Sequence, residues 1–473
     1  MKEKTNRAIT GVLLFLVFFL LASCQSKQMN LTNLEQNLET LEQYELLEIK
    51  FTLPEKNSDS NKLNHRPYAE FITPDNEKLK VFAFEYQGFS RGLVNNHEIL
   101  TKINKQEWNI RYVPEEIGEY EYKIKVNEKT IYDNGKFQSE KSENKEFVRT
   151  ADTNSFYFDS GEKFFPVGMN IAWHSERGTY DYDYYFQRLK DNNIDLVRIV
   201  MTPWSLGLEW SNQTSYGITS DYTGLETYSQ ENSWRLDHIL QSAENNDIYI
   251  ILTFDIYGEL REESNDPREQ LWEYNPYNKE NNGFLDSPEE FFTNERAKTT
   301  YKRKLDYIIS RWSHNTNILG WELWNEADIT ENYNKESFYE WNDEMYDYLK
   351  KIDEYQHFIT TSFADVELAQ GFWENHKYDY INIHLYSSNV SEEIISVIEN
   401  LDKYEKPILI SEFGLGQTSE PELKDISGSN LQNTIKKSIE QEIAGSAMPW
   451  WWDEYIDKYN LYQVLGKYSI ENE

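Results

Sequence analysis

Two carboxyl groups stand at the ends of two apolar segments of this chain. Residues 321–328 read Trp-Glu-Leu-Trp-Asn-Glu-Ala-Asp, an apolar run that ends in the polar pair Asn325-Glu326. Residues 408–414 read Ile-Leu-Ile-Ser-Glu-Phe-Gly, so Glu412 ends a second apolar run. Two carboxyl groups held at strand ends can serve as proton donor and as nucleophile or base, which is the minimum equipment for cleaving a glycosidic bond.

Eight apolar runs alternate with amphipathic helical segments after residue 152, and these elements must position the carboxyl groups. The runs cover residues 164–170, 196–201, 248–254, 318–324, 358–361, 380–384, 407–411 and 447–451. Eight βα units predict an α/β fold of the (β/α)8 TIM barrel type, whose chemistry lies at the C-terminal ends of the strands. The helix after the third run is predicted to start at the capping box Ser287-Pro-Glu-Glu290. Only residues 461–470 remain for an eighth helix, whose formation is in doubt.

Further polar and aromatic residues gather where these runs end. The candidates for substrate binding are Arg198, Asn325, His384, Tyr386, Trp450, Trp451, Trp452, Trp173, His174 and Asp255. Each has a structural alternative: Arg198 could be an ion-pair partner, His384 a core histidine and Trp451 simple packing. Agreement across seven strand ends nevertheless favours a site. Trp321 and Trp324 lie on the strand itself and are expected to pack inside the barrel.

This constellation resembles the glycoside hydrolases of clan A, and most nearly family 5, the cellulase and β-mannanase type. The resemblance runs from about residue 164 to residue 465 and rests on Arg198, Asn325-Glu326, His384-x-Tyr386, Ser411-Glu412-Phe-Gly and the tryptophans at 450–452. Asp255 departs from the pattern, since many relatives offer histidine there, and its role stays open. The short motifs are specific for the clan in combination and say little about the substrate.

The resemblance implies a retaining mechanism with Glu326 as general acid/base and Glu412 as nucleophile. It implies cleavage of a neutral β-linked polysaccharide or oligosaccharide of the mannan or β-glucan type by double displacement. It also implies that Asn325 binds the sugar 2-hydroxyl, that Arg198 and Tyr386 hold Glu412 ionised, and that a tryptophan at 450–452 stacks on the sugar. A catalytically silent glycan-binding surface lipoprotein is the alternative, and a structural or adhesion protein is a third. A binding protein has no need of both glutamates.

Residues 43–150 carry a different pattern, with short segments of alternating polar and apolar residues separated by turn-prone clusters. Such a pattern predicts a β-sandwich of the immunoglobulin type. The segment also resembles the immunoglobulin-like module that precedes such barrels in some bacterial proteins, on Trp108-Asn-Ile-Arg and Pro114-x-x-x-Gly118. We expect the catalytic domain to cover residues 151–473.

The N-terminus has the features of an export signal. Residues 1–24 combine a basic start, an apolar stretch and Leu21-Ala-Ser-Cys24, which looks like a bacterial lipobox. These features predict a signal peptide, lipidation at Cys24 and an exported, cell-surface lipoprotein whose only membrane contact is this anchor. Residues 25–42 are predicted to be a polar tether. Cys24 is the only cysteine, so an internal disulfide and a thiol-based site are ruled out.

The composition restricts the ligand class. A formal net charge of −35 disfavours nucleic acid, anionic lipid surfaces and polyanionic substrates, and a neutral carbohydrate fits better. The same charge could simply keep an exported protein soluble. The 14 Trp, 34 Tyr and 24 Phe suit both core packing and sugar faces. The eight histidines show no metal-ligand spacing and no nucleotide-binding loop is present, so neither a metal nor a cofactor is implied.

Overall fold

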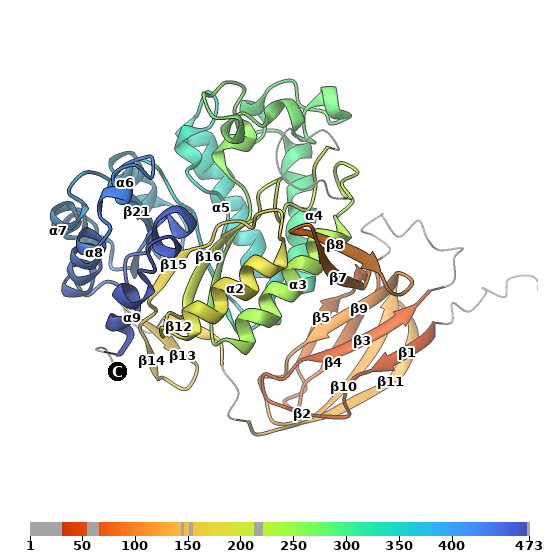
Figure 1. The fold of residues 1–473 in the computed structure, drawn as a ribbon. Coiled ribbons are helices and arrows are strands. Elements are labelled where there is room, and N and C mark those ends of the chain that lie inside the picture. The colour runs from red at the N-terminus through yellow and green to blue at the C-terminus, as the bar shows by residue number, and fades with distance from the viewer. Residues whose placement is uncertain (1–30, 54–65, 143–145, 151–154, 212–220, 471–473) are drawn as a thin grey trace, which may run out of the picture.

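The computed structural model describes residues 31–53, 66–142, 146–150, 155–211 and 221–470. The predicted signal peptide with Cys24, and residues 25–30 of the predicted tether, lie outside the described residues. Figure 1 shows a β-domain, formed by the first part of the chain, beside a larger α/β domain. Within the described ranges no helix is both long enough and apolar enough to cross a lipid bilayer.

The β-domain consists of two sheets with the strand orders β1-β3-β9-β6 and β2-β11-β10-β4-β5. Residues on alternate positions of β3 are buried and belong to the same apolar core as Phe71 and Ile124 of the other sheet. This period of two follows from the pleat of a strand. The strands are β1 (Thr32–Gln36), β2 (Thr40–Glu42), β3 (Leu47–Thr52), β4 (Tyr68–Ile72), β5 (Lys78–Phe82), β6 (Phe84–Tyr86), β9 (Glu107–Tyr112), β10 (Gly118–Val126) and β11 (Lys129–Glu140).

The prediction of a polar tether up to residue 42 is wrong for its second half. Strand β1 pairs antiparallel with β3, and β2 pairs parallel with β11. Leu41 is buried in the core of the β-domain, while its neighbours Thr40 and Glu42 are exposed. Each is an edge strand with one solvated face, so its polar composition did not indicate that it pairs in a sheet.

Seven parallel strands of the second domain follow the predicted order. Each predicted run from the second to the seventh contains a strand, and each strand is almost wholly buried. The strands are β15 (Gly168–Asn170), β16 (Leu196–Val200), β17 (Tyr249–Thr253), β18 (Ile318–Glu322), β19 (Phe358–Thr360), β20 (Ile381–Tyr386) and β21 (Ile408–Gly414). Their buried faces explain why the sequence reads as continuous apolar runs.

The eighth run closes the barrel without forming a regular strand. Its residues lie between β21 and β15: Met448 N–H donates to Ile410 O at 2.9 Å, and Asn170 N–H donates to Pro449 O at 3.1 Å. Pro449 forms an isolated parallel bridge with Phe413. Proline has no N–H to donate, which limits the ladder at this point.

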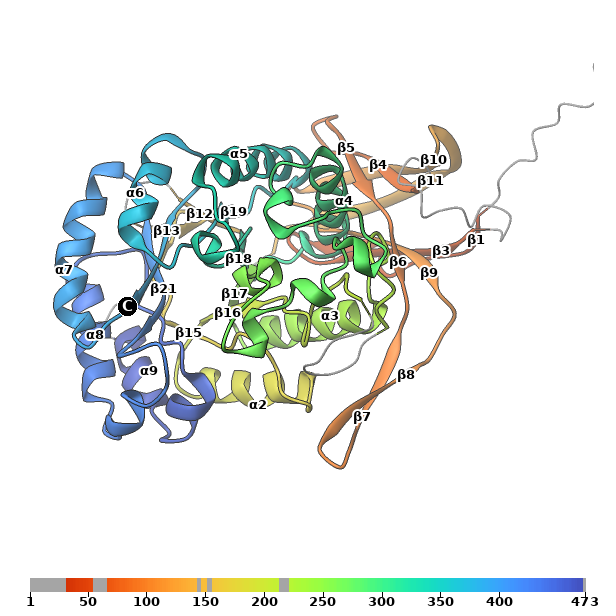
Figure 2. The same cartoon turned by 90° about the horizontal axis from the view of Figure 1, so that it is seen from above.

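In the part of the chain that the structure describes, eight α-helices belong to this domain, and Figure 2 shows them around the strands. They are α2 (Thr179–Lys190), α3 (Gln230–Asn245), α4 (Glu295–Trp312), α5 (Lys335–Ile352), α6 (Val366–Asn375), α7 (Val390–Leu401), α8 (Ser429–Glu440) and α9 (Tyr462–Ile470). The eighth helix, which the sequence left in doubt, is therefore present as α9. The predicted start of α4 is wrong: residues 288–290 form a 3-10 turn, and the side chain of Asn294 caps α4 by accepting from the N–H groups of Arg296 and Ala297.

A small sheet covers the N-terminal end of the barrel and corrects two predicted boundaries. Strands β12 (Val148–Thr150), β13 (Phe156–Phe158) and β14 (Lys163–Phe164) form it. Phe156 and Phe164 pack in one cluster with Tyr249 and Met448 of the barrel wall. The first predicted barrel strand therefore starts at residue 168 rather than 164. Because β12 pairs with β13, the domain boundary precedes residue 148.

Candidate active site

Arg198 on β16 lies at the centre of the polar groups inside the barrel, and it is fully buried. Its Nε and Nη2 donate to the two carboxylate oxygens of Glu322 on β18, at 2.6 and 2.8 Å. Its Nη1 donates to Glu412 Oε1 at 2.5 Å and to Asn170 Oδ1 at 3.3 Å, and Nη2 donates to Asn325 Oδ1 at 2.7 Å. One guanidinium group thereby orients a carboxylate of β21 and the amide that follows β18.

Glu322, which the sequence pattern did not single out, neutralises the buried Arg198. Its carboxylate also accepts from Thr253 Oγ1 at 2.8 Å and from Ser362 Oγ at 2.6 Å. Burial acts to raise the pKa of Glu322, but the charge and hydrogen bonds of Arg198 lower it below its ordinary value. The sequence held one signal for Glu322: it is a charged residue inside an apolar run, and a buried charge needs a partner.

Glu412 at the end of β21 has a donor on each carboxylate oxygen. Arg198 occupies Oε1, and the hydroxyl of Tyr386 donates to Oε2 at 2.5 Å. Burial raises the pKa of Glu412, while His384, Arg198 and the Tyr386 hydrogen bond act against this rise. The donors stabilise the ionised carboxylate in a site that otherwise disfavours charge.

Glu326 has a different environment. Its backbone has a left-handed conformation, with φ 53° and ψ 52°, at the turn after β18. Its Oε1 lies 2.8 Å from Nδ1 of His384. Burial, together with the negative charges of Glu322 and Glu269, raises the pKa of Glu326 to about 7, although Arg198 lowers it. This carboxyl group can therefore hold a proton near neutral pH.

The two carboxyl groups are close enough to act on one bond. A carboxylate oxygen of Glu326, a carboxylate oxygen of Glu412 and a ring nitrogen of His384 all lie within 4.8 Å of one another. Retaining glycosidases hold their two carboxyl groups about 5–5.5 Å apart, and inverting ones about 6.5–9.5 Å apart. Burial lowers the pKa of His384, whose ring nitrogen Nδ1 lies near both carboxyl groups.

The same three side chains are close enough to serve as ligands of a metal ion. Both oxygens of Glu412 already accept hydrogen bonds, one of them from the cationic Arg198. A second cation at this position would be repelled by the guanidinium group. These contacts therefore favour Glu412 as an ionised carboxylate that takes part in a reaction, and they disfavour Glu412 as a metal ligand.

Trp173 lies at the centre of a cluster of four tryptophans. The ring of Trp173 packs edge-to-face on Trp204, Trp450 and Trp452, with centroids 5.2–5.6 Å apart. Trp452 is buried, and Trp450 and Trp173 are partly exposed. The N–H of Trp450 donates to the carbonyl oxygen of Phe413 at 3.0 Å, so Trp450 lies next to the residue that follows Glu412. Trp450 is thus the best placed of residues 450–452 to meet a sugar.

Trp451 points to the other side of the wall. Its ring lines a small cavity together with Phe413, Leu431 and Tyr455. This position fits packing better than the predicted contact with substrate. Trp321 and Trp324 are also buried, as predicted, and Trp321 Nε1 donates to Asp353 at 2.9 Å.

Asp255, one of the substrate-binding candidates, is held by side chains of the protein. Its carboxylate forms an ion pair with Lys304 of α4 at 2.5 Å and accepts from the hydroxyl of Tyr301 at 2.7 Å. The residue is buried. It joins the end of β17 to α4, and these two partners stabilise its buried charge, while its contact with substrate stays a prediction.

His174 is likewise buried rather than presented to a ligand. Its Nδ1 lies 2.8 Å from the carbonyl oxygen of Ser175, and its ring packs on Tyr182 of α2. Burial lowers its pKa. These contacts indicate that His174 supports the loop that carries Trp173, and its contact with substrate stays a prediction.

The family of the barrel is decided by its sequence. The Cellulase family, which is glycosyl hydrolase family 5, matches residues 158–453. The chain belongs to glycosyl hydrolase family 5. The family 5 region includes β15 to β21 and with them Arg198, Glu322, Glu326 and Glu412. A second family, a domain of unknown function (DUF5060), matches residues 40–127, within the β-domain.

Curated relatives of this family 5 chain carry a common description. The Aspergillus flavus "Probable mannan endo-1,4-beta-mannosidase A" is 26% identical over 243 residues, which cover 50% of this chain and 56% of that protein. The Hypocrea jecorina "Mannan endo-1,4-beta-mannosidase A" is 26% identical over 235 residues, 48% of each chain. The chain spans about half the length of the curated relatives it matches.

Solved structures share the fold of this family 5 chain. The endo-1,4-beta-mannanase of Rhizomucor miehei has a TM-score of 0.51 and 18% identity, over 69% of this chain and 99% of that one. A protein of Bacteroides vulgatus ATCC 8482, described as a candidate glycoside hydrolase, has a TM-score of 0.57 and 15% identity, over 87% of this chain and 72% of that one. At these identities the likeness concerns the fold, and it confirms the predicted (β/α)8 barrel.

Proposed function

We propose that this family 5 chain is a retaining β-glycoside hydrolase with Glu326 as general acid/base and Glu412 as nucleophile. The observation that carries the proposal is a pair of carboxyl groups within 4.8 Å of each other that have different hydrogen-bond partners. Glu412 accepts hydrogen bonds from Arg198 and Tyr386, which favour its ionised form. Glu326 has a pKa raised to about 7 and can carry the proton that the leaving group needs.

In the first step a carboxylate oxygen of Glu412 attacks the anomeric carbon of the sugar. The glycosidic C–O bond breaks, its electron pair goes to the departing oxygen, and that oxygen takes the proton of Glu326. The products of this step are a glycosyl ester of Glu412, a free hydroxyl on the leaving sugar and an ionised Glu326.

In the second step water releases the sugar. Once Glu412 is esterified its negative charge is gone, so the pKa of Glu326 falls and the carboxylate can act as a base. It takes a proton from water, the water oxygen attacks the anomeric carbon, and the ester bond to Glu412 breaks. Two displacements at one carbon retain its configuration.

Asn325 and Trp450 would bind the sugar during these steps. Arg198 donates to Oδ1 of Asn325, which fixes the amide and leaves its Nδ2 donors to meet a hydroxyl of the substrate. Trp450 offers an aromatic face on the side of Glu412, and apolar sugar faces pack well on such rings.

We infer that the substrate is a neutral β-linked glycan of the mannan type. Support comes from the relatives, which are named mannan endo-1,4-beta-mannosidases. The net charge of −35 also disfavours acidic polysaccharides.

We further propose that the β-domain is of the immunoglobulin type and that the chain is an exported lipoprotein anchored through Cys24. Replacement of Cys24 by alanine, followed by fractionation of the host cells, tests the anchor, because the variant would no longer accompany the membrane fraction.

Covalent trapping tests the enzymatic proposal. The protein is incubated with 2-deoxy-2-fluoro glycosides of gluco and manno configuration that carry a good leaving group, and the labelled peptide is mapped. We expect a label on Glu412 with the manno reagent and none in the E412Q variant. The alternative, a silent glycan-binding protein, would be favoured by the absence of any label together with glycan binding that survives both E326Q and E412Q.

A further inference from the structure

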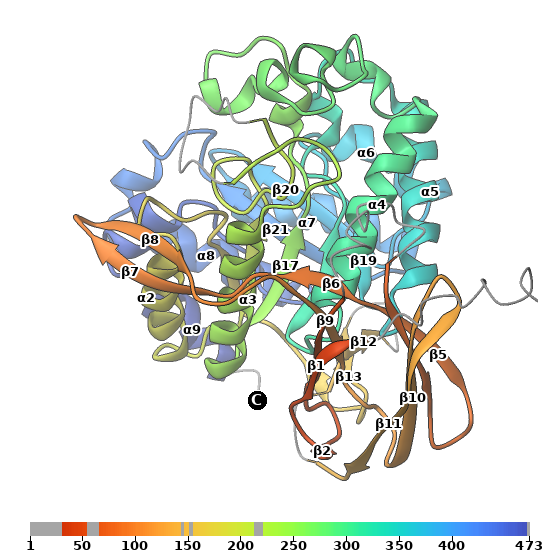
Figure 3. The same ribbon diagram turned by 90° about the vertical axis from the view of Figure 1, so that its right-hand side faces the viewer.

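A hairpin of the β-domain leaves its two sheets and lies along the barrel. Strands β7 (Phe89–Val94) and β8 (His97–Lys102) pair antiparallel and form a sheet of their own. Figures 2 and 3 show this hairpin extending from the β-domain beside the helices α2 and α3. Near its tip the side chain of Glu98 is fully buried against these helices.

Glu98 caps helix α2 from outside the barrel. Its Oε1 accepts from the N–H of Thr179, the first residue of α2, at 2.9 Å. The residue before it, Gly178, has no side chain that could provide this cap, and its φ is +58°. A Cβ at Gly178 would lie 2.2 Å from Glu98 Oε2, so glycine is required both by the backbone conformation and by the approach of Glu98. A carboxylate at a helix N-terminus is stabilised by the unpaired N–H groups and by the helix dipole.

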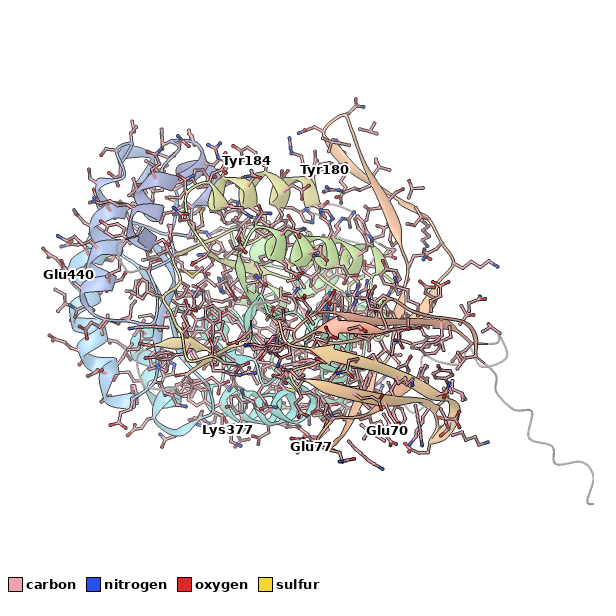
Figure 4. All side chains as sticks on the ribbon, turned by 90° about the horizontal axis from the view of Figure 1, so that it is seen from below. Glu70, Glu77, Tyr180, Tyr184, Lys377 and Glu440 are labelled. Carbon is pink, nitrogen blue, oxygen red and sulfur yellow. The ribbon has the colours of Figure 1, made fainter. Side chains whose placement is uncertain are left out.

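Other contacts hold the hairpin against the loop before α2. The N–H of Glu98 donates to the carbonyl of Glu176 at 2.9 Å, within that loop. Arg91 forms an ion pair with Asp183 at 2.6 Å and stacks over the ring of Tyr180, 4.2 Å from its centroid. Figure 4 shows Tyr180 at the end of α2 that lies nearer to the hairpin. Residues 171–178 are therefore held by the barrel strand β15 at one end and by the hairpin at the other.

That loop carries Trp173, and a second connection leads from Glu98 to the loop that carries Trp204. Arg235 of α3 pairs with Glu98 Oε2 at 2.6 Å and donates to Asn232 Oδ1 at 2.7 Å. Asn232 in turn donates to the carbonyl of Gly207 at 2.8 Å. The loops that carry Trp173 and Trp204, whose rings pack on each other, are thus both connected to the carboxylate of Glu98.

We propose that Glu98 is a positioning residue for the side chains of Trp173, Trp204 and Trp450, which we call the sugar-binding wall. Through Glu98 the β-domain determines how tightly the protein binds a long glycan. This inference rests on the proposed glycosidase function. Glu98 contacts Thr179 and Arg235 rather than the reacting groups, so it acts on where Trp173 stands and leaves the carboxyl pair of Glu326 and Glu412 unchanged. The β-domain is then part of the substrate-binding apparatus rather than a spacer.

Kinetics of the full chain with E98Q test the proposal. The glutamine keeps the size of the side chain but presents a neutral amide to the buried Arg235. We expect kcat/KM on a manno-oligosaccharide to fall by about 10-fold or more, mainly through KM, because small displacements of a binding group have large effects. Hydrolysis of 2,4-dinitrophenyl β-mannoside, which occupies little more than the cleavage subsite, is expected to change less than about 2-fold. The control is K102Q, which removes an exposed charge at the other end of β8 and is expected to leave both activities intact.

A double-mutant cycle with W173A separates positioning from general destabilisation. If Glu98 acts through Trp173, E98Q has little further effect on the oligosaccharide in the W173A background. An equal loss on both substrates, or an unchanged loss in that background, would overturn the proposal. If E98Q melts below the assay temperature, E98D, which keeps the charge, is compared in the same way and is expected to retain more oligosaccharide activity than E98Q at a lower temperature. If the wild-type chain hydrolyses neither substrate, the glycosidase function is refuted instead. Oligosaccharide binding, followed by tryptophan fluorescence, would then still show whether E98Q lowers the affinity for the oligosaccharide.

Discussion

Arg198 and Glu322 form a neutral ion pair beneath the two carboxyl groups of the proposed reaction. If Glu326 and Glu412 were both ionised, two like charges would lie within 4.8 Å in a buried site. Like charges this close disfavour each other's ionised form, so one of the groups keeps a proton. Arg198 and Tyr386 both donate to Glu412, which leaves Glu326 as the group that holds the proton. The division of roles therefore follows from which carboxylate the arginine touches.

The charge of Glu269 contributes to the proton affinity of Glu326, which gives a prediction on pH dependence. Glu269 raises the pKa of Glu326, whose value is about 7, so activity that needs a protonated Glu326 declines as the pH rises through this range. Replacing Glu269 by glutamine removes a negative charge and lowers that pKa. We expect the alkaline limb of the pH profile of kcat/KM to move to lower pH in E269Q.

The matched control is E273Q, an exposed carboxyl group of the same loop. It is expected to leave the alkaline limb in place. A limb that moves to higher pH in E269Q, or one that moves equally in both variants, would contradict the electrostatic origin of the Glu326 pKa.

At the same residue scale, the sequence predicted Glu326, Glu412, His384 and Tyr386 together because each stands at or just past the end of an apolar run. Arg198 lies within its run and was predicted through the family resemblance. Parallel strands of a barrel bring such ends together, whatever their separation in the chain. Glu322 escaped this logic, since it lies within its run. Glu322 pairs with Arg198, which lies on another strand, and the sequence of one segment alone does not indicate such a pairing.

At the scale of elements, helix starts were the least predictable feature. Ser287 heads a sequence that matches a capping box, yet it makes no side-chain cap, and residues 288–290 form a separate 3-10 turn. Asn294 caps α4 instead, with its Oδ1 accepting from two N–H groups. Serine and asparagine both favour the N-cap position, so the local sequence offered two possible starts for α4.

This choice of cap predicts a difference between two alanine variants. N294A removes the hydrogen bonds to the first turn of α4 and is expected to lower the free energy of unfolding by about 1 kcal/mol. S287A removes a side chain that caps nothing and is expected to cost less than about 0.5 kcal/mol. Urea unfolding followed by circular dichroism measures both. A larger loss for S287A than for N294A would show that the helix starts at the capping box after all.

At the scale of the whole molecule, the two domains share a buried charge cluster. Asp237 of α3 accepts from Arg111 of β9 at 2.8 Å and from Arg311 of α4 at 2.7 Å. It also accepts from Trp312 Nε1 at 2.8 Å. Burial acts to raise the pKa of Asp237, but the two arginines lower it well below its ordinary value. The β-domain is thereby fastened to the barrel at this cluster as well as by the hairpin β7–β8.

We expect D237N to destabilise the whole chain, because it leaves two buried arginines without their shared anion. The expected loss is about 3–5 kcal/mol in the free energy of unfolding. Because the pKa of Asp237 is depressed in the folded state, its contribution is present above the unfolded value of about 3.9 and is lost as the pH falls below it. The wild-type advantage over D237N is therefore expected to shrink in acid.

The control for this variant is D247N, which removes an exposed pair with Lys190 and is expected to cost less than about 1 kcal/mol. Urea titrations of the three proteins at neutral and acid pH provide the comparison. Equal stability of D237N and wild type at neutral pH would mean that the cluster does not couple the domains.

The stereochemistry of hydrolysis tests the central claim most directly, since the spacing of Glu326 and Glu412 predicts it. Proton NMR follows the anomeric signals during hydrolysis of a β-linked manno-oligosaccharide, before the new reducing end can mutarotate. We predict that the first product to appear is the β-anomer, because two displacements at the anomeric carbon retain its configuration. A product that appears first as the α-anomer would mean inversion, and would contradict the assignment of Glu412 as the nucleophile.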